Sequence, residues 1–189
     1  MKVIAFNGSS RENGNTKMLL ETVLKELDLE GMDTELLWLG NKALPGCLAC
    51  YKCQQNKNGR CAQDDILNQY LEKMLEADGI ILGSPTYFAD VSASMKALVE
   101  RCGMVSRVNG DMLKRKVGAA VVAVRRAGAF HVFSSLNAFF LIGQMIVVGS
   151  SYWNIGIGKD PGQVAGDDEG IKTMKDLGRN MAWLLKSIR

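Results

Sequence analysis

The sequence lacks a long apolar run. No stretch approaches the roughly 20 consecutive apolar residues that a membrane-spanning helix requires. Met1 and Lys2 lead into a short predicted strand, so the first residues do not read as a signal peptide. We therefore expect a cytoplasmic protein without a membrane partner.

Concentrated positive charge and inter-domain linkers are also missing. The net charge is +3, and the basic residues are scattered except for short groups at 114–116 and 125–126. Because binding to a nucleic-acid backbone needs a concentrated basic face, this charge pattern gives no indication of nucleic-acid binding. A chain of 189 residues without a linker is typical of one domain with a substantial core, so we expect a single domain over residues 1–189.

Histidine is scarce, since His131 is the only one. It opens an apolar helix pattern, where an isolated histidine is more often a packing or capping residue than a catalytic base. Cys102 lies on an apolar helix face and is interpreted as an inert core thiol. The stretch 156–162 imitates a dinucleotide-binding fingerprint, but its glycine spacing is wrong and it does not join a first strand to a helix.

What the sequence does contain is an alternation of strand and helix patterns. Five apolar runs, at 3–6, 36–39, 79–83, 117–124 and 145–149, are separated by segments with helical spacing of apolar residues. Continuously apolar strands separated by helices favour a parallel sheet covered on both faces. We therefore predict an α/β fold with a doubly wound, five-stranded parallel sheet and helices on both faces. With a flavodoxin-like strand order, the loops after the first, third and fourth strands would converge at one edge.

The loop between the first strand and the first helix has the composition of an anion site. Residues 7–16 combine glycines with polar side chains and the cation Arg11. Uncapped amides at a helix N-terminus and the helix dipole favour a phosphate there. Further hydrogen bonds can come from Ser9, Ser10, Asn15 and Thr16. The alternative is an ordinary turn capped by Asn13 or Asn15.

Two further loops follow strands of the predicted sheet. The segment 84–90 is a polar and aromatic turn after the third strand, and the segment 125–128 is basic and ends the fourth. Each has a simple alternative interpretation. Ser-Pro followed by Ala-Asp commonly builds a turn, and a pair of charges is weak evidence that also fits a solvated turn.

Four of the five cysteines crowd into residues 47–61. In a reducing compartment such crowding indicates metal or redox chemistry rather than structural disulfides. Cys47, Cys50 and Cys53 have CxxCxxC spacing, which can wrap around an iron-sulfur cluster while Cys61 takes the remaining iron. The pattern favours a [4Fe-4S] cluster, although alanine follows the last cysteine where bacterial ferredoxins have proline. Zinc and unligated thiols are the alternatives.

Four segments carry a resemblance to a known family. In chain order they are GSSRENGNT at 8–16, GSPTYF at 83–88, VRRAG at 124–128 and GSSYWN at 149–154. Together they resemble the NADPH-dependent FMN reductases, a group of flavodoxin-like proteins. The cysteine-rich loop at 46–61 makes the chain similar to the iron-sulfur flavoproteins in particular. The resemblance extends from the first strand to the last helix.

The resemblance implies two cofactors, FMN and a [4Fe-4S] cluster. The FMN 5′-phosphate would contact Ser9, Arg11, Asn13, Asn15 and Thr16. The isoalloxazine ring would be bordered by Pro85, Thr86, Tyr87 and Phe88. In the third loop, Arg126 would lie near the flavin edge or attract a nicotinamide phosphate. The cluster ligands would be Cys47, Cys50, Cys53 and Cys61.

These features predict an FMN-dependent oxidoreductase that relays electrons between FMN and the cluster. No catalytic side chain is predicted, because the cofactors carry the chemistry. The cysteine loop follows the second strand, so both cofactor loops are expected at the same edge of the sheet. The resemblance implies a homodimer or homotetramer, with NAD(P)H as a possible donor and a small molecule or protein as redox partner. The runner-up is a cluster-free NAD(P)H-dependent FMN or quinone reductase, followed by a non-enzymatic domain with a zinc-pinned loop.

Overall fold

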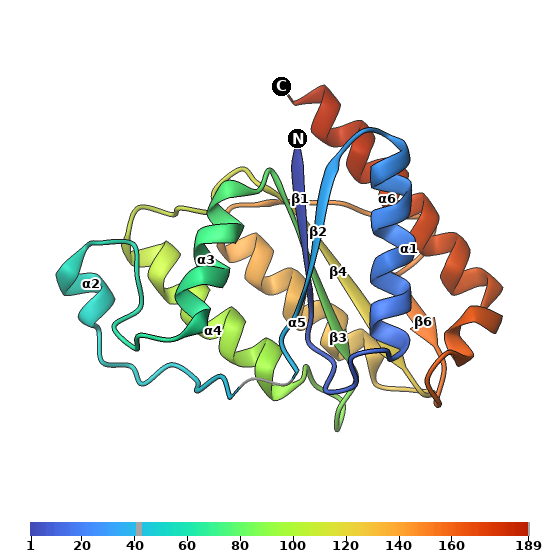
Figure 1. Cartoon of the computed structure of the whole chain (residues 1–189), viewed down its shortest axis with the longest axis horizontal. Helices are drawn as coiled ribbons and strands as arrows, with labels where there is room; N and C mark the ends of the chain where they lie inside the picture. Colours follow the sequence, from blue (N-terminus) through green and yellow to red (C-terminus); the bar gives the residue numbers. More distant parts are fainter. Residues whose placement is uncertain (41–42, 189) are drawn as a thin grey trace.

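The computed structural model describes residues 1–40 and 43–188. At its centre is a parallel sheet with the strand order β2-β1-β3-β4-β5, and β6 pairs with β4 beside this path. The strands are β1 (Lys2–Asn7), β2 (Asp33–Trp38), β3 (Gly79–Pro85), β4 (Val117–Val124), β5 (Ile146–Val147) and β6 (Ile155–Ile157). This order confirms the predicted flavodoxin-like, doubly wound fold (Figure 1).

The central strands are buried along almost their whole length. Every residue of β3 and β4 is buried, as is β1 from its second residue onward. Successive side chains of a strand point to opposite faces. Ile4 and Phe6 therefore belong to one core, whereas Val3 and Ala5 belong to the other. The apolar runs at 3–6, 79–83 and 117–124 therefore correspond to strands that are covered on both sides.

Helices cover both faces of the sheet (Figure 1). One face packs against α1 (Asn15–Leu29) and α6 (Asp168–Ser187). The other packs against α3 (Ile66–Glu76), α4 (Ala93–Val108) and α5 (Ala129–Ile142). Two short elements complete the chain, α2 (Lys52–Asn56) and the 3₁₀ helix η1 (Gln163–Gly166). Within residues 1–40 and 43–188, none of the helices combines the length and hydrophobicity of a transmembrane segment.

The far edge of the sheet differs from the prediction. The apolar run 145–149 forms only the two-residue strand β5, which pairs with the beginning of β4. The strand β6, which the sequence did not predict, pairs with the end of β4. Asn154 bridges the gap between them, because its Nδ2 donates to the Ala120 carbonyl oxygen at 3.0 Å. A three-residue strand with a central glycine has no alternation of apolar residues that could reveal it.

The segment of residues 43–65, which precedes α3, lies away from the sheet and runs along α4. In Figure 1 its helix α2 lies at the side of the molecule, beyond α4. Lys57 Nζ donates to the Val108 carbonyl oxygen at 2.6 Å. Asn109, which follows α4, accepts from the Gly59 N–H at 3.2 Å and donates to the Cys53 carbonyl oxygen at 3.3 Å. The cysteines are therefore held against a helix rather than against the sheet.

The close packing around β6 leads to a prediction about stability. A Cβ at Gly156 would lie 2.6 Å from Leu19 Cδ2 and 2.7 Å from Val164 Cγ2. We expect Gly156→Ala to lower the free energy of unfolding in urea by about 1–3 kcal/mol, because it overpacks the core. Gly166→Ala is the control, since a Cβ there meets no described atom within 4 Å. Equal losses in the two variants would contradict the packing argument.

Candidate functional site

Loops from four strands form a cleft at the carboxyl edge of the sheet. The cleft has a volume of about 310 Å³, at the lower end of the range for small-molecule sites. Its walls come from the loops after β1, β3, β4 and β6, so the expected convergence of three loops is present and a fourth joins them. Seven of the predicted flavin contacts line it: Ser9, Arg11, Asn15, Thr16, Pro85, Thr86 and Tyr87.

The N-terminus of α1 opens onto the cleft. Gly14 is the N-cap residue, and among the described residues no side chain caps the helix there. The first amide N–H groups of α1 therefore lack the usual capping acceptor, and the helix dipole adds partial positive charge. Arg11 also lines the cleft and is exposed, so it adds a full positive charge. This combination is suited to a phosphate group.

Hydrogen bonds within the first loop fix its shape. The Ser9 N–H donates to Asn7 Oδ1 at 3.0 Å, and the Arg11 N–H donates to Ser9 Oγ at 3.1 Å. From β2, the Trp38 Nε1–H donates to the Ser9 carbonyl oxygen at 2.7 Å. Asn7 and Ser9 are both buried. The loop is therefore held in place by the protein itself, which spares a ligand the cost of ordering it.

Asn15 ties this loop to a distant part of the chain. Its Oδ1 accepts from the Gly162 N–H at 2.9 Å and from the Val164 N–H at 3.4 Å. Its Nδ2 donates to the Gly158 carbonyl oxygen at 2.9 Å. The side chain that the resemblance assigns to the phosphate is thus largely engaged in protein contacts. It positions the wall of the cleft that follows β6.

The turn after β3 closes another side of the cleft. Tyr87 Oη and Ser10 Oγ are hydrogen-bonded at 2.8 Å, which joins the turn to the first loop. Thr86 Oγ1 is buried and has no hydrogen-bond partner among the described residues. A buried hydroxyl without a partner carries a free-energy cost. Thr86 is also one of the residues that line the cleft.

Three predicted flavin contacts do not line the cleft. Asn13 is exposed and accepts from Lys17 Nζ at 2.9 Å. Phe88 is fully exposed, in a turn whose backbone is left-handed at that residue, with φ of 48°. Arg126 also lies outside the lining, and its neighbour Arg125, the first residue after β4, lines the cleft instead.

Sequence reasoning missed the wall that follows β6. Gly158, Lys159 and Asp160 line the cleft there. Because β6 is parallel to β4 and pairs with its end, the loop after β6 must lie at the same edge. A Cβ at Gly158 would lie 2.7 Å from the Val164 backbone nitrogen. The signal in the sequence is the glycine-rich stretch 156–162, which does not have the spacing of a dinucleotide fingerprint but does follow β6.

The four clustered cysteines line one small cavity beside α4, the cysteine cavity. Cys47, Cys50, Cys53 and Cys61 all border it, together with Arg101. Cys47 and Cys50 are exposed, Cys61 is half-buried and Cys53 is buried. Burial raises the pKa of the Cys53 thiol. The four residues with the predicted spacing therefore line one cavity, which measures only about 20 Å³.

The cysteine cavity offers thiol donors, the ligand type of both zinc sites and iron-sulfur clusters. In the part of the chain that the structure describes, no three metal-binding side chains lie close enough to hold a single ion. In a [4Fe-4S] cluster each thiolate binds a different iron, so the thiols need not converge on one point. Ala49 and Tyr51, on either side of Cys50, have left-handed φ angles of 50° and 54°. Such backbone can turn amides into the concavities found at many iron-sulfur sites.

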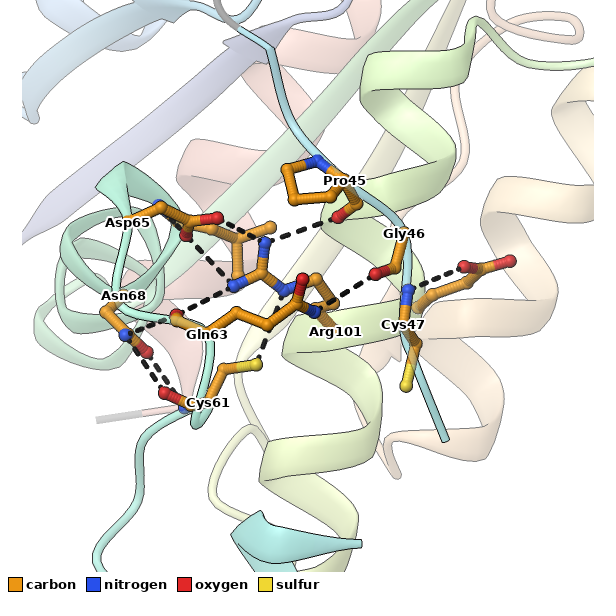
Figure 2. A network of polar contacts seen from close by, with 10 residues as sticks. Pro45, Gly46, Cys47, Cys61, Gln63, Asp65, Asn68 and Arg101 are labelled. Atoms are coloured by element: carbon orange, nitrogen blue, oxygen red, sulfur yellow. Dashed lines mark hydrogen bonds and ion pairs between the residues drawn. The ribbon is translucent and has the colours of Figure 1, made fainter. Parts of the chain in front are cut away.

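A buried arginine on α4 holds both ends of the cysteine segment (Figure 2). The Arg101 side chain is 0% exposed, and five hydrogen bonds engage its guanidinium. It donates to both carboxylate oxygens of Asp65 at 2.7 and 2.9 Å. It also reaches the carbonyl oxygens of Pro45 at 3.3 Å and Gln63 at 3.0 Å. Its Nε–H donates to Cys61 Sγ at 3.4 Å.

The protonation of Arg101 follows from these contacts. Burial acts to lower its pKa, but the hydrogen bonds to Asp65 and Cys61 outweigh burial and raise the pKa. The guanidinium is therefore a permanent positive charge beside the cysteine cavity. A second buried side chain, Asn68 on α3, accepts from the Cys61 N–H at 2.8 Å and donates to the Cys61 carbonyl oxygen at 3.1 Å. These contacts order the backbone around Cys61.

The cleft and the cysteine cavity are separate sites. Among the described residues, none lines both of them. In Figure 1, α2 lies at the left, beyond α4. The strand β6 and the start of α1 lie at the right, on the other side of the central strands. The cysteine segment begins at the expected edge, but it carries its thiols away along α4. The expectation that both cofactor loops lie at one edge therefore holds only for the start of this segment.

The fold is flavodoxin-like, with a cleft at the carboxyl edge of a parallel sheet. The chain is similar to RosB, solved with bound 8-demethyl-8-formylriboflavin-5′-phosphate, with a TM-score of 0.78 and 19% identity over 100% of this chain and 80% of that one. It is also similar to a flavodoxin from the domain Archaea, with a TM-score of 0.65 and 18% identity over 98% of this chain and 99% of that one. These likenesses concern the fold.

Sequence comparison defines the family. Residues 1–160 match the family described as NADPH-dependent FMN reductase. An iron-sulfur flavoprotein of Methanocaldococcus jannaschii is 41% identical over 196 residues, which cover 100% of both chains. The chain belongs to the NADPH-dependent FMN reductase family, and it is an FMN-dependent oxidoreductase. The resemblance carried by the four sequence segments and the cysteines is thereby confirmed.

Thiol exposure predicts an order of alkylation in the metal-free protein. We expect iodoacetamide to modify the exposed Cys47 and Cys50 well before Cys102, which is fully buried and whose pKa is strongly raised by burial. Alkylation requires the thiolate, so both burial and the raised pKa slow the reaction. Mass spectrometry of peptides from a time course measures the order. Protein unfolded in urea is the control, and equal rates at Cys47 and Cys102 in folded protein would contradict the prediction.

Proposed function

We propose that the chain transfers electrons between FMN bound in the cleft and a [4Fe-4S] cluster bound by Cys47, Cys50, Cys53 and Cys61. When bound, FMN accepts two electrons and the cluster passes one at a time, so the pair would couple two-electron to one-electron redox partners. The observation that carries the proposal is that all four cysteines border a single cavity. The name of the 41% identical relative, an iron-sulfur flavoprotein, supports the same assignment.

The cleft supports a specific orientation of FMN. The phosphate would lie at the start of α1, near Arg11, because the uncapped amides and the cation favour an anion there. The flavin ring would lie toward the turn after β3, where Thr86 Oγ1 has no partner among the described residues. Lys159 and Arg125 add positive charge to the opposite wall. The role of these side chains is to bind and orient the flavin, and none is proposed as an acid or base.

We also propose that the protein works as a homodimer or homotetramer. The cleft and the cysteine cavity of one chain share no described lining residue, so a second copy is suited to bring a cleft and a cysteine cavity together. Large apolar side chains are exposed on α5, at Phe130, Leu141 and Ile142, and on the neighbouring Trp153. The rings of Phe130 and Trp153 lie 4.9 Å apart. The exposed pair of Phe130 and Trp153 is a candidate for a contact between subunits.

The donor and acceptor are proposed as small molecules or redox proteins, with NAD(P)H as one candidate donor. A cytoplasmic location fits the five cysteines, all of which are free thiols. A cluster-free NAD(P)H-dependent reductase of FMN or quinones is the second candidate. One observation favours it: the cysteine cavity has a volume of only about 20 Å³.

Metal and flavin analysis separates the two candidates. We expect protein purified without oxygen to contain about four irons per chain, and to show flavin bands above a broad absorption in the visible. The variant with Cys47, Cys50, Cys53 and Cys61 changed to serine should lose the iron and keep FMN, because the cleft does not involve these residues. Stoichiometric zinc, or wild-type protein free of metal, would contradict the cluster. Undiminished NADPH oxidation by the four-serine variant would favour the second candidate.

A phosphate at the start of α1 predicts a selective effect of Arg11→Ala. We expect the Kd for FMN to rise on the order of tenfold, because a charge-assisted hydrogen bond is lost. The Kd for riboflavin, which has no phosphate, should change little. Fluorescence quenching of each flavin measures both constants. Lys25→Ala is the control, since Lys25 is exposed farther along α1 and does not line the cleft. Equal losses for FMN and riboflavin would show that Arg11 does not bind the phosphate.

A further inference from the structure

We infer that Arg101 is a positioning residue that raises the reduction potential of the [4Fe-4S] cluster through the hydrogen bond from its Nε–H to Cys61 Sγ. The inference rests on the proposed function, because it concerns the proposed cluster. It goes beyond that function, since it assigns a tuning role to a side chain that is not a ligand.

The position of Arg101 on α4 needs a physical reason. Leu98, Cys102 and Val105 surround it on the buried face of the helix, where an apolar side chain would satisfy packing. A buried ion pair seldom stabilises a fold more than apolar residues of similar volume would. The pair of Arg101 with Asp65 is buried on the arginine side, while the Asp65 side chain is 25% exposed. Stability alone therefore does not account for a guanidinium at this place.

The orientation of the guanidinium supplies the reason. Its two terminal nitrogens, Nη1 and Nη2, face Asp65 and two carbonyl oxygens, whereas Nε faces the sulfur of Cys61. The network in Figure 2 therefore aims one N–H at a predicted ligand atom while the other donors fix the direction of that bond. Such fixed second-layer contacts orient metal ligands and tune the metal.

The sign of the effect follows from charge. Reduction adds negative charge to a cluster, and hydrogen bonds to its sulfurs and nearby positive charge favour the more negative state. The Nε–H of Arg101 is such a donor, and its guanidinium is such a charge. Arg101 therefore favours reduction. Asp65 works in the opposite direction, because its carboxylate neutralises part of the guanidinium charge.

Arg101 also sets the distance between the first and the last cysteine. It binds the carbonyl oxygen of Pro45, two residues before Cys47, and that of Gln63, two residues after Cys61. Loss of this clamp alone would loosen the segment and admit water. Water stabilises the more highly charged reduced state, so loosening by itself would raise the potential. The tuning role and a purely structural role thus predict shifts of opposite sign when the hydrogen bond is removed.

The test compares reduction potentials of variants that carry a full cluster. Arg101→Lys keeps the net charge and removes the guanidinium fork, so that the directed Nε–H to Cys61 is lost. Asp65→Asn keeps the guanidinium and a good helix cap, but it removes the counter-charge. Arg107→Lys is the control, because Arg107 lies on the same helix, is exposed and pairs with Asp111 at 2.8 Å. Electron paramagnetic resonance during a redox titration measures each potential, and iron and sulfide assays verify the cluster.

We expect opposite shifts in the two variants. In Arg101→Lys the ratio of reduced to oxidised cluster at a fixed solution potential should fall about tenfold, which corresponds to about 59 mV for a one-electron couple. In Asp65→Asn the ratio should rise, and in Arg107→Lys it should not change. An unchanged or raised potential in Arg101→Lys with a full cluster would overturn the inference. If the Arg101→Lys variant assembles no cluster, the Asp65→Asn variant provides the test. An unchanged or lowered reduction potential in Asp65→Asn would also overturn the inference.

Failure of the proposed function would look different. Wild-type protein without iron and sulfide after anaerobic reconstitution would overturn the cluster itself, and the inference with it. A full cluster whose potential does not respond to Arg101 or Asp65 overturns the inference alone.

Discussion

The central strands β1, β3 and β4 are buried on both faces, so their backbone polar groups must find every partner within the sheet. Parallel pairing satisfies this requirement and also sends all of the carboxyl ends to one edge. Along these three strands, polar side chains and unpaired amides are tolerated only where the strands end. The uncapped start of α1, the lone hydroxyl of Thr86 and the cation Arg125 meet in one cleft for this reason.

Much of this arrangement can be predicted from the sequence, because burial on two faces produces continuous apolar runs. Those runs predict β1, β3, β4 and part of β2, and the loops that follow them predict most of the cleft. The strand order was expected from the resemblance to flavodoxin-like proteins. The details at strand ends are harder. Arg125 and Arg126 are adjacent, and only the exact end of β4 decides which one lines the cleft. A one-residue difference in a strand moves a side chain to the other face, and boundaries are the least predictable part of an element.

Arg101 shows a different limit of prediction from the sequence. The apolar spacing of α4 marks its neighbours as core residues, and a charged residue among them is normally expected to be exposed. Its acceptors lie 36 to 56 residues away in the sequence, on segments without regular structure. No local pattern brings them together. The spacing of the cysteines indicated which side chains share a cavity, whereas the charge beside them emerged only from tertiary packing.

The contacts of Asn15 bear on the order in which parts of the chain are synthesised. The backbone groups that this side chain binds lie 143 to 149 positions later in the chain. The first loop is translated long before the wall that follows β6. The cleft is therefore complete only after both parts have been made and have folded against each other. The first loop alone does not form the proposed flavin site.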